Sequence, residues 1–289
     1  MFIEDHELSV RNGISHIASF LDVNWMNGHQ EAIDLLERKE GSRSGCLRSV
    51  ALVSEVRGMH SYFAESSFDG MKKWAYVAAK LRIMLNHLQT GEDYLTGDLL
   101  WPLISDNEDV IDWYRQHSRP YMLSKKESGG DKDDPKSFMF YRYQSWLALN
   151  QRWDELRQRC ELILSMQDQI KKDRSYLIDH RFYLALANGD RAGMESVLME
   201  KVQPKQRKAR HDQESGLTHS FIVSYATMFA KLAWRNGYEV QVDTPWIPKE
   251  WLPVKPPDNY EDPWPFMQSF DIFQQFEGEL VTWSPVRNR

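Results

Sequence analysis

The chain has 289 residues, of which 42% are hydrophobic and 27% are charged, the balance of a globular protein that can bury a large core. Its formal net charge of −6 argues against a general nucleic-acid binder, because phosphate contacts require an excess of basic residues. No apolar run approaches the roughly 20 residues that a membrane-spanning helix needs, so we expect none.

The cysteines and the first residues indicate the compartment. Cys46 and Cys160 are far apart and neither lies in a CxxC pair, which is typical of a protein in a reducing compartment. Residues 1–7 are acidic and lack the basic and then apolar layout of a signal peptide. We therefore expect a cytoplasmic protein.

Amphipathic helices are predicted one after another in the N-terminal part. Apolar residues recur at helical spacing over 8–23, 29–38 and 46–64. Ser67 is a suitable N-cap for a further helix around Trp74. The lengths and spacings indicate antiparallel helical hairpins rather than strands.

Two helix pairs of similar layout are predicted after a loop at 128–135. The first pair spans 138–150 and 153–164, and the second spans 175–187 and 191–199. The second pair repeats the first after 37 residues, and tetratricopeptide helix pairs repeat at about 34. We therefore predict tetratricopeptide-like packing, although two copies are fewer than the three that a solenoid needs.

The most apolar stretch, 217–234, is predicted to form one helix that protein covers on most sides, because apolar residues occupy nearly every face of it. Asn236 and Gly237 suit a left-handed C-cap at its end. The tail beyond is rich in proline and large aromatic residues, so we expect it to wrap the helical body.

These elements together predict an all-α protein. Its expected parts are antiparallel helical hairpins with tetratricopeptide-like packing, one buried C-terminal helix and a proline- and aromatic-rich wrapping tail. We expect a single helical domain over residues 1–289, with 1–127 and 136–289 as its two candidate halves.

The sequence contains no pattern of catalysis or cofactor binding. Phosphate loops, dinucleotide-binding glycine turns, nucleophile elbows and zinc-binding HExxH helices are all missing from it. Asp179, His180 and Arg181 are adjacent on a predicted helix, point about 100° apart and do not build one site. His219 is interpreted as a hydrogen-bonded core histidine. We expect no enzyme activity, no metal and no cofactor.

Two segments combine acidic with aromatic side chains, a pattern that suits the binding of a basic partner. The candidate partner-binding residues are Trp101, Asp106, Glu108, Asp109, Asp112 and Trp113 in the first segment and Asp258, Glu261, Asp262 and Trp264 in the second. The alternative for each segment is a solvated rim above packed aromatic residues. The basic residues of 201–211 have no aromatic residue among them and are interpreted as a solvated connector.

The C-terminal block carries a family resemblance. Residues 226–234 read ATMFAKLAW, 237–240 read GYEV and 243–253 read DTPWIPKEWLP. This succession resembles the immunity 49 family, the cytoplasmic antidotes of bacterial polymorphic toxin systems. The resemblance covers the chain from about residue 138 onward, and the helical immunity proteins known as PoNi end similarly. It implies an all-helical protein that inhibits by binding, without catalytic residues.

The resemblance implies a protein that binds a cognate toxin, encoded beside it, and blocks the toxin's active site or substrate access. The partner is then a protein, with no nucleic acid and no membrane involved. Two alternatives are a helical-repeat scaffold that binds a peptide or a regulatory protein, and an enzyme with scattered site residues. A toxin reading frame beside the gene favours the antidote, whereas a His and a carboxylate that converge in a pocket favour the enzyme.

Overall fold

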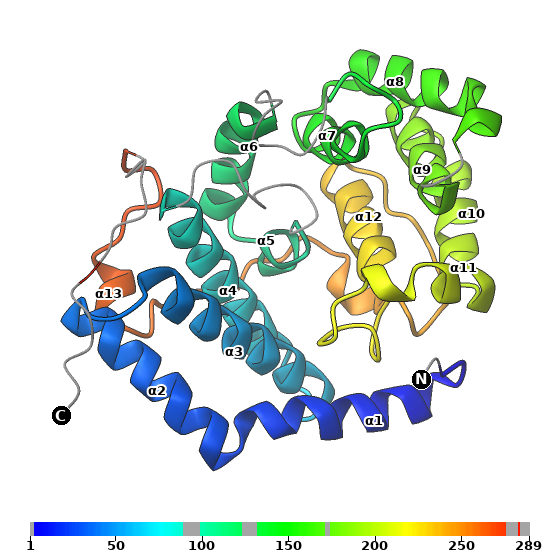
Figure 1. The fold of residues 1–289 in the computed structure, drawn as a ribbon. Coiled ribbons are helices and arrows are strands. Elements are labelled where there is room, and N and C mark those ends of the chain that lie inside the picture. The colour runs from blue at the N-terminus through cyan, green and yellow to red at the C-terminus, as the bar shows by residue number, and fades with distance from the viewer. Residues whose placement is uncertain (1–2, 89–98, 123–131, 171–173, 276–282, 284–289) are drawn as a thin grey trace. The chain divides into compact units, whose positions relative to one another are not determined.

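The computed structural model describes residues 3–88, 99–122, 132–170, 174–275 and 283 (Figure 1). Within these ranges every regular element is a helix, so the all-α prediction is confirmed. The tetratricopeptide-like packing of the helix pairs stays a prediction.

The chain divides into two compact units, each assembled from three segments. Unit 1 comprises Met1–Ser9, Gly91–Ile104 and Tyr114–Val254, and unit 2 comprises Val10–Thr90, Ser105–Trp113 and Lys255–Arg289. Each unit therefore joins residues that are far apart in the sequence.

The centre of unit 2 is a pair of long helices, α3 (Arg43–Phe63) and α4 (Phe68–Leu88), which pack along each other (Figure 1). The helix α2 (Val23–Arg38) packs against α3, and α13 (Pro265–Gln268) packs against α2. Their contact surfaces are apolar, and the fully buried side chains include those of Leu47, Val50, Val56, Met59, Met71, Leu81 and Ile83. Burial of this surface is the main force that holds the helices together.

Side-chain caps fix where the helices of unit 2 begin. The predicted N-cap Ser67 accepts a hydrogen bond from the N–H of Gly70 at 3.2 Å. The single helix predicted over 8–23 is interrupted, because Asp22 accepts from the N–H groups of Asn24 and Trp25 and so begins α2. Before that cap lie α1 (His6–Ala18) and a 3-10 turn, η1 (Ser19–Leu21).

Both predicted helix pairs are present in unit 1. The first is α7 (Phe138–Leu149) and α8 (Trp153–Ser165), and the second is α9 (Leu177–Ala187) and α10 (Arg191–Lys201). The helix α9 packs against α7, α8 and α10. Gly189 lies in the turn between α9 and α10 with φ of +67°, a left-handed conformation that glycine adopts without a Cβ clash.

The buried C-terminal helix, α12 (Ser224–Arg235), begins later than the predicted 217–234. The N–H of Val223 donates to the carbonyl of Trp246 at 2.9 Å, and the N–H of Ser224 donates to the carboxylate of Glu214 at 3.0 Å. These partners lie outside the helix and hold the preceding residues in turns. The predicted left-handed cap at Gly237 is confirmed, with φ of +83°.

The first part of the tail is fastened to α12 within unit 1. Lys231 is fully buried, and its ammonium group donates to the carbonyls of Trp251 at 2.9 Å and Pro253 at 2.8 Å. The indole N–H of Trp234 donates to the carbonyl of Val240 at 3.1 Å. A buried lysine in a helix thus satisfies carbonyl groups of the irregular tail.

The remaining described elements are short or lie across unit boundaries. They are α5 (Leu100–Ser105), α6 (Glu108–Met122), α11 (Pro204–Ala209), η2 (Gln167–Gln169), η3 (Arg174–Tyr176), η4 (His211–Gln213) and η5 (Lys249–Trp251). No helix in the described part of the chain combines the length and the hydropathy that crossing a membrane requires.

Candidate functional site

The predicted partner-binding residues differ in their access to solvent. Trp101 belongs to unit 1 and the other nine belong to unit 2. Trp101, Asp106 and Trp113 are buried, Asp112, Asp262 and Trp264 are partly buried, and Glu108, Asp109, Asp258 and Glu261 are exposed. A partner can reach the four exposed carboxylates directly, and we call these four residues the acidic surface.

Asp106 is an internal residue that joins three segments of unit 2. One of its carboxylate oxygens accepts from the ammonium group of Lys72 at 2.6 Å and from the backbone N–H of Lys255 at 3.1 Å. The same ammonium group donates to the carbonyl of Lys255. The side chains of Asp106 and Lys72 are at most 1% exposed, so this ion pair holds the fold rather than a partner.

Two further contacts bring the predicted acidic segments together. The hydroxyl of Tyr260 donates to the carbonyl of Ser105 at 2.6 Å. Asp262 accepts from Tyr76 at 3.0 Å and from Lys80 at 2.7 Å. Burial, and then the charge and hydrogen bond of Asp262, raise the pKa of Tyr76 well above its ordinary value, so this tyrosine stays a donor. The two segments that the sequence singled out therefore adjoin in one unit.

The acidic residues of the two segments differ in their surroundings. Asp106 and Asp262 form ion pairs with Lys72 and Lys80, whereas the four residues of the acidic surface are exposed. Such charge steers a basic partner and raises its association rate. Its contribution to the final affinity is smaller, because exposed charges are screened.

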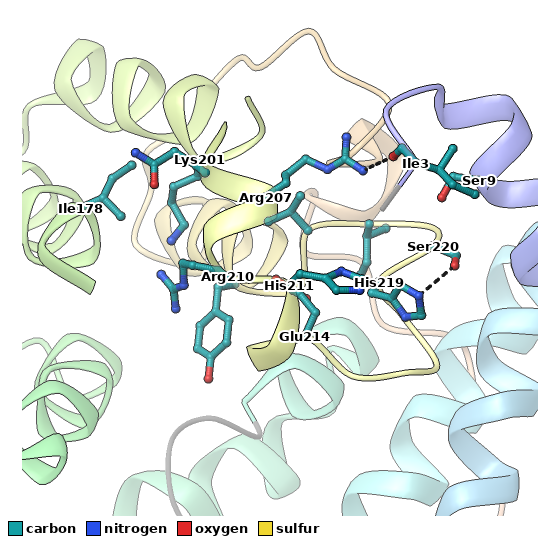
Figure 2. A pocket seen from close by; sticks show the side chains of 14 residues that line it. Ile3, Ser9, Ile178, Lys201, Arg207, Arg210, His211, Glu214, His219 and Ser220 are labelled. Atoms are coloured by element: carbon teal, nitrogen blue, oxygen red, sulfur yellow. Dashed lines mark hydrogen bonds between the residues drawn. The ribbon is translucent and has the colours of Figure 1, made fainter. Parts of the chain in front are cut away.

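A second site, absent from the predicted set, is a cavity of about 40 Å³ in unit 1 (Figure 2). Lys201, Arg207 and Arg210 line it, and each is at least nine-tenths buried. We call this cavity, with these three side chains, the basic pocket. The prediction of a solvated connector over 201–211 is wrong for these residues, because they turn inward into the cavity that α10, α11 and α12 help to form.

Lys201 and Arg210, which line the basic pocket, belong to a buried ion cluster with Asp179. Asp179 accepts from Lys201, and both of its oxygens accept from one nitrogen of Arg210, at 2.6 and 2.7 Å. Burial alone would raise the pKa of Asp179, but the charges and hydrogen bonds of the two cations outweigh it and hold the pKa below its ordinary value. The guanidinium of Arg210 also lies over the rings of Tyr176 and Tyr225, at 4.5 and 4.8 Å from their centroids.

The two residues that follow Asp179 on α9 do not join its ion cluster. This agrees with the prediction that the three adjacent residues do not build one site. His180 is fully buried, and its ring lies 4.9 Å from that of Tyr141. Burial lowers the pKa of His180 to about 3, so it is neutral. Arg181 forms an exposed ion pair with Glu200 at 2.8 Å.

Arg207 occupies the side of the pocket toward the N-terminal segment. Its guanidinium donates to the carbonyl of Ile3 at 2.9 Å, as Figure 2 shows, and lies 3.2 Å from the ring centroid of Trp246. Burial lowers the pKa of Arg207 to about 10, although the charges of Glu4 and Glu214 act in the opposite direction. The carboxylates around this cation therefore do not offset its burial.

Two histidines line the pocket beside the cations. The rings of His211 and His219 are perpendicular, with centroids 5.3 Å apart. His219 contacts the carbonyl of Ser215 at 3.1 Å and the hydroxyl of Ser220 at 3.3 Å. His219 is hydrogen-bonded as expected, but it is partly exposed and does not lie in the core.

The spacing of the basic residues over 201–211, unlike their number, indicates which of them face the pocket. Pro204 at the first position of α11 starts a helix within the basic run. Residues three apart on a helix share a side, so Arg207 with Arg210 faces inward while Lys205 with Lys208 is exposed. The contribution of Asp179 was not accessible to this reasoning, because it depends on the packing of α9.

Metal and thiol chemistry gain no support from the described residues. No group of three or more His, Cys, Asp or Glu side chains in the described ranges is arranged to hold a metal ion. Cys46 and Cys160 are both buried free thiols, and burial raises the pKa of each. A thiol with a raised pKa is a poor nucleophile at neutral pH.

The regular elements in the described part of the chain are all helices. Residues 117–251 match the family model of Immunity protein 49. This match confirms the resemblance found in the sequence. The matched segment lies within unit 1 and contains the three cations of the basic pocket. No curated protein and no solved structure matches the chain.

Proposed function

We propose that this protein binds a cognate bacterial toxin and neutralises it by covering the toxin's active site or its substrate access. The observation that carries the proposal is the match of residues 117–251 to Immunity protein 49. Inhibition by binding needs a stable fold with complementary surfaces rather than a catalytic centre. In this proposal the protein acts in the cytoplasm, without a cofactor, on the product of a neighbouring gene.

The acidic surface of unit 2 supports a partner with a basic face. Glu108, Asp109, Asp258 and Glu261 are exposed, and negative charge of this kind accelerates association with a positive partner. Trp264 follows Glu261 by three residues and stacks on Phe266, with the ring centroids 5.8 Å apart. A partly exposed aromatic pair supplies the apolar contact that charged residues alone do not give.

The test is co-expression with the protein encoded by the adjacent gene. We expect that the neighbour alone arrests growth, that co-expression restores growth, and that the two proteins purify together. The control is a frameshifted copy of the present gene, which should leave the arrest unchanged. Rescue of growth without a complex would contradict a binding mechanism, and toxicity that persists despite normal expression would contradict the proposed function.

A further inference from the structure

We propose that unit 1 contains an internal hydration site, in which the buried His180 binds one or two water molecules. The site is a cavity of about 30 Å³ that residues of α7, α9 and α12 line, and we call it the His180 cavity. Tyr225 lines both this cavity and the basic pocket, but the three cations of the basic pocket do not line it. The inference concerns the interior of the protein and does not depend on toxin binding.

The first observation is the surroundings of the His180 ring. The side chain is fully buried and lines the cavity. Neither ring nitrogen has a hydrogen-bond partner in the part of the chain that the structure describes. A neutral imidazole has one donor and one acceptor, and buried polar groups are nearly always hydrogen-bonded, either to protein or to ordered water. The ring therefore calls for a ligand that can both accept and donate.

The second observation is another buried donor at the same cavity. Arg142 of α7 lines it, and the Nε of this residue is buried without a hydrogen-bond partner among the described residues. The guanidinium of Arg142 lies over the ring of Phe138, 4.7 Å from its centroid. A buried water needs two to four polar partners, and His180 together with Arg142 supplies them.

The size and the walls of the His180 cavity define the ligand. One water needs roughly 10–15 Å³ by this kind of measure, so the cavity has room for about two waters and not for a metabolite. Six of the ten lining residues are Phe or Tyr, and an apolar ligand among them would leave both ring nitrogens without a partner. Water meets both requirements, because it is small and it both donates and accepts.

Bound water gives α7 and α9 an additional polar contact. These helices pack against each other and share one direct side-chain hydrogen bond at the cavity, between the hydroxyls of Ser145 and Tyr183 at 2.7 Å. A hydrogen bond through water is nearly as favourable in enthalpy as a direct one. The hydration site therefore joins Arg142 of α7 to His180 of α9 beside the direct bond.

The test is NMR on the full-length protein at neutral pH, with isotope-labelled histidine. Magnetisation transfer from water to the carbon-bound ring protons has one sign for a water that stays bound and the opposite sign for solvent that exchanges quickly. We expect the bound-water sign at His180 and the fast-exchange sign at His16, which is exposed. If no transfer from water reaches His180, the cavity is dry and the proposal is overturned.

A crystal structure is an independent test. We expect electron density for water within hydrogen-bonding distance of Nδ1 or Nε2 of His180. A cavity without such density, or a protein group that occupies the position and bonds to the ring, would overturn the hydration site.

Two variants test whether the ring nitrogens are hydrogen-bonded. His180→Leu removes both nitrogens. Tyr183→Phe is the matched control, because it removes from the same cavity a hydroxyl that is hydrogen-bonded to Ser145. Above pH ~6.5, where His180 is neutral in the folded and the unfolded state, we expect each variant to lower the melting temperature by roughly 2–4 °C for each hydrogen bond lost.

A rise of the melting temperature for His180→Leu would show that the ring nitrogens lack partners, and the proposal would fall. If a variant does not fold, the measurements on the wild type still decide. None of these experiments uses the toxin, so failure of the hydration site and failure of the proposed function are distinguishable.

Discussion

At the scale of single residues, Asp179 holds two cations together inside unit 1. Its carboxylate lies between Lys201 and Arg210, and all three side chains are buried. Without the negative charge, the two cations would repel each other in a medium that screens poorly. The position therefore contributes to folding and holds Lys201 and Arg210, which line the basic pocket.

We predict that Asp179→Asn lowers the free energy of unfolding by about 3–5 kcal/mol, the typical effect of removing one partner from a buried ion pair. Urea denaturation followed by circular dichroism measures the change. The control is Asp154→Asn, whose ion pair with Arg157 is exposed and should be worth about 1 kcal/mol or less. Equal effects of the two variants would show that the buried ion cluster stabilises the fold no more than an exposed ion pair does.

His180 should make the protein sensitive to acid. Its pKa is lowered by burial to about 3 in the folded state and is about 6.5 in an unfolded chain. Between these pH values the unfolded state binds a proton that the folded state excludes. The free energy of unfolding therefore falls as pH decreases from 6.5 toward 3, by up to about 1.4 kcal/mol per pH unit. Above pH 6.5 His180 is neutral in the folded and the unfolded state, so it does not change how the free energy of unfolding depends on pH.

The variant His180→Leu should flatten this dependence. We predict a shallower loss of stability between pH 6 and 4 than in the wild type, measured by urea denaturation at several pH values. His16 is exposed, so His16→Leu should keep the wild-type slope. If His180→Leu also kept that slope, acid sensitivity would have to come from other groups.

At the scale of elements, periodicity predicted helices well where each helix has one apolar side. The helix pairs α7–α8 and α9–α10 begin and end within about two residues of the predicted limits. The start of α12 was predicted too early, because apolar turns and an apolar helix have the same composition. Only the bonds from Val223 to Trp246 and from Ser224 to Glu214 decide between them.

The sequence predicted the acidic segments but did not predict the basic pocket. The acidic segments were found from their acidic and aromatic residues, but the burial of Asp106 was not, because its partner Lys72 lies far away in the sequence, on α4. The basic pocket was missed, because a run of cations in a connector usually remains solvated. Long-range pairing decides which charged residues turn inward, and a single sequence does not contain that pairing.

The contact between α12 and the tail depends on Lys231. We predict that Lys231→Met, which leaves the carbonyls of Trp251 and Pro253 without this donor, lowers stability by about 1–3 kcal/mol. It should also speed hydrogen exchange at the N–H of Leu252. Lys249→Met, at an exposed position of the same tail, should do neither. Unchanged exchange in Lys231→Met would show that apolar packing alone fixes the tail.

At the scale of the whole molecule, the proposed function implies that the acidic surface sets the rate at which the protein associates with a toxin. We predict that Glu108→Lys with Glu261→Lys slows association by about tenfold at low ionic strength, and that the difference shrinks as salt is added. Stopped-flow mixing measures the rates. The matched control, Asp154→Lys with Glu161→Lys, reverses two exposed acids of unit 1. Identical rates for the two double variants would remove the acidic surface from the encounter.

The carboxylate of Asp106 has a consequence for biosynthesis. It binds the backbone N–H of Lys255 and, through Lys72, a helix made far earlier on the ribosome. Unit 2 therefore cannot be completed until the intervening residues, most of them belonging to unit 1, have been translated. A nascent chain released before Lys255 would carry a charged pair with an open flank, a state that chaperones and proteases recognise. Chains truncated before Lys255 would thus be removed before they accumulate.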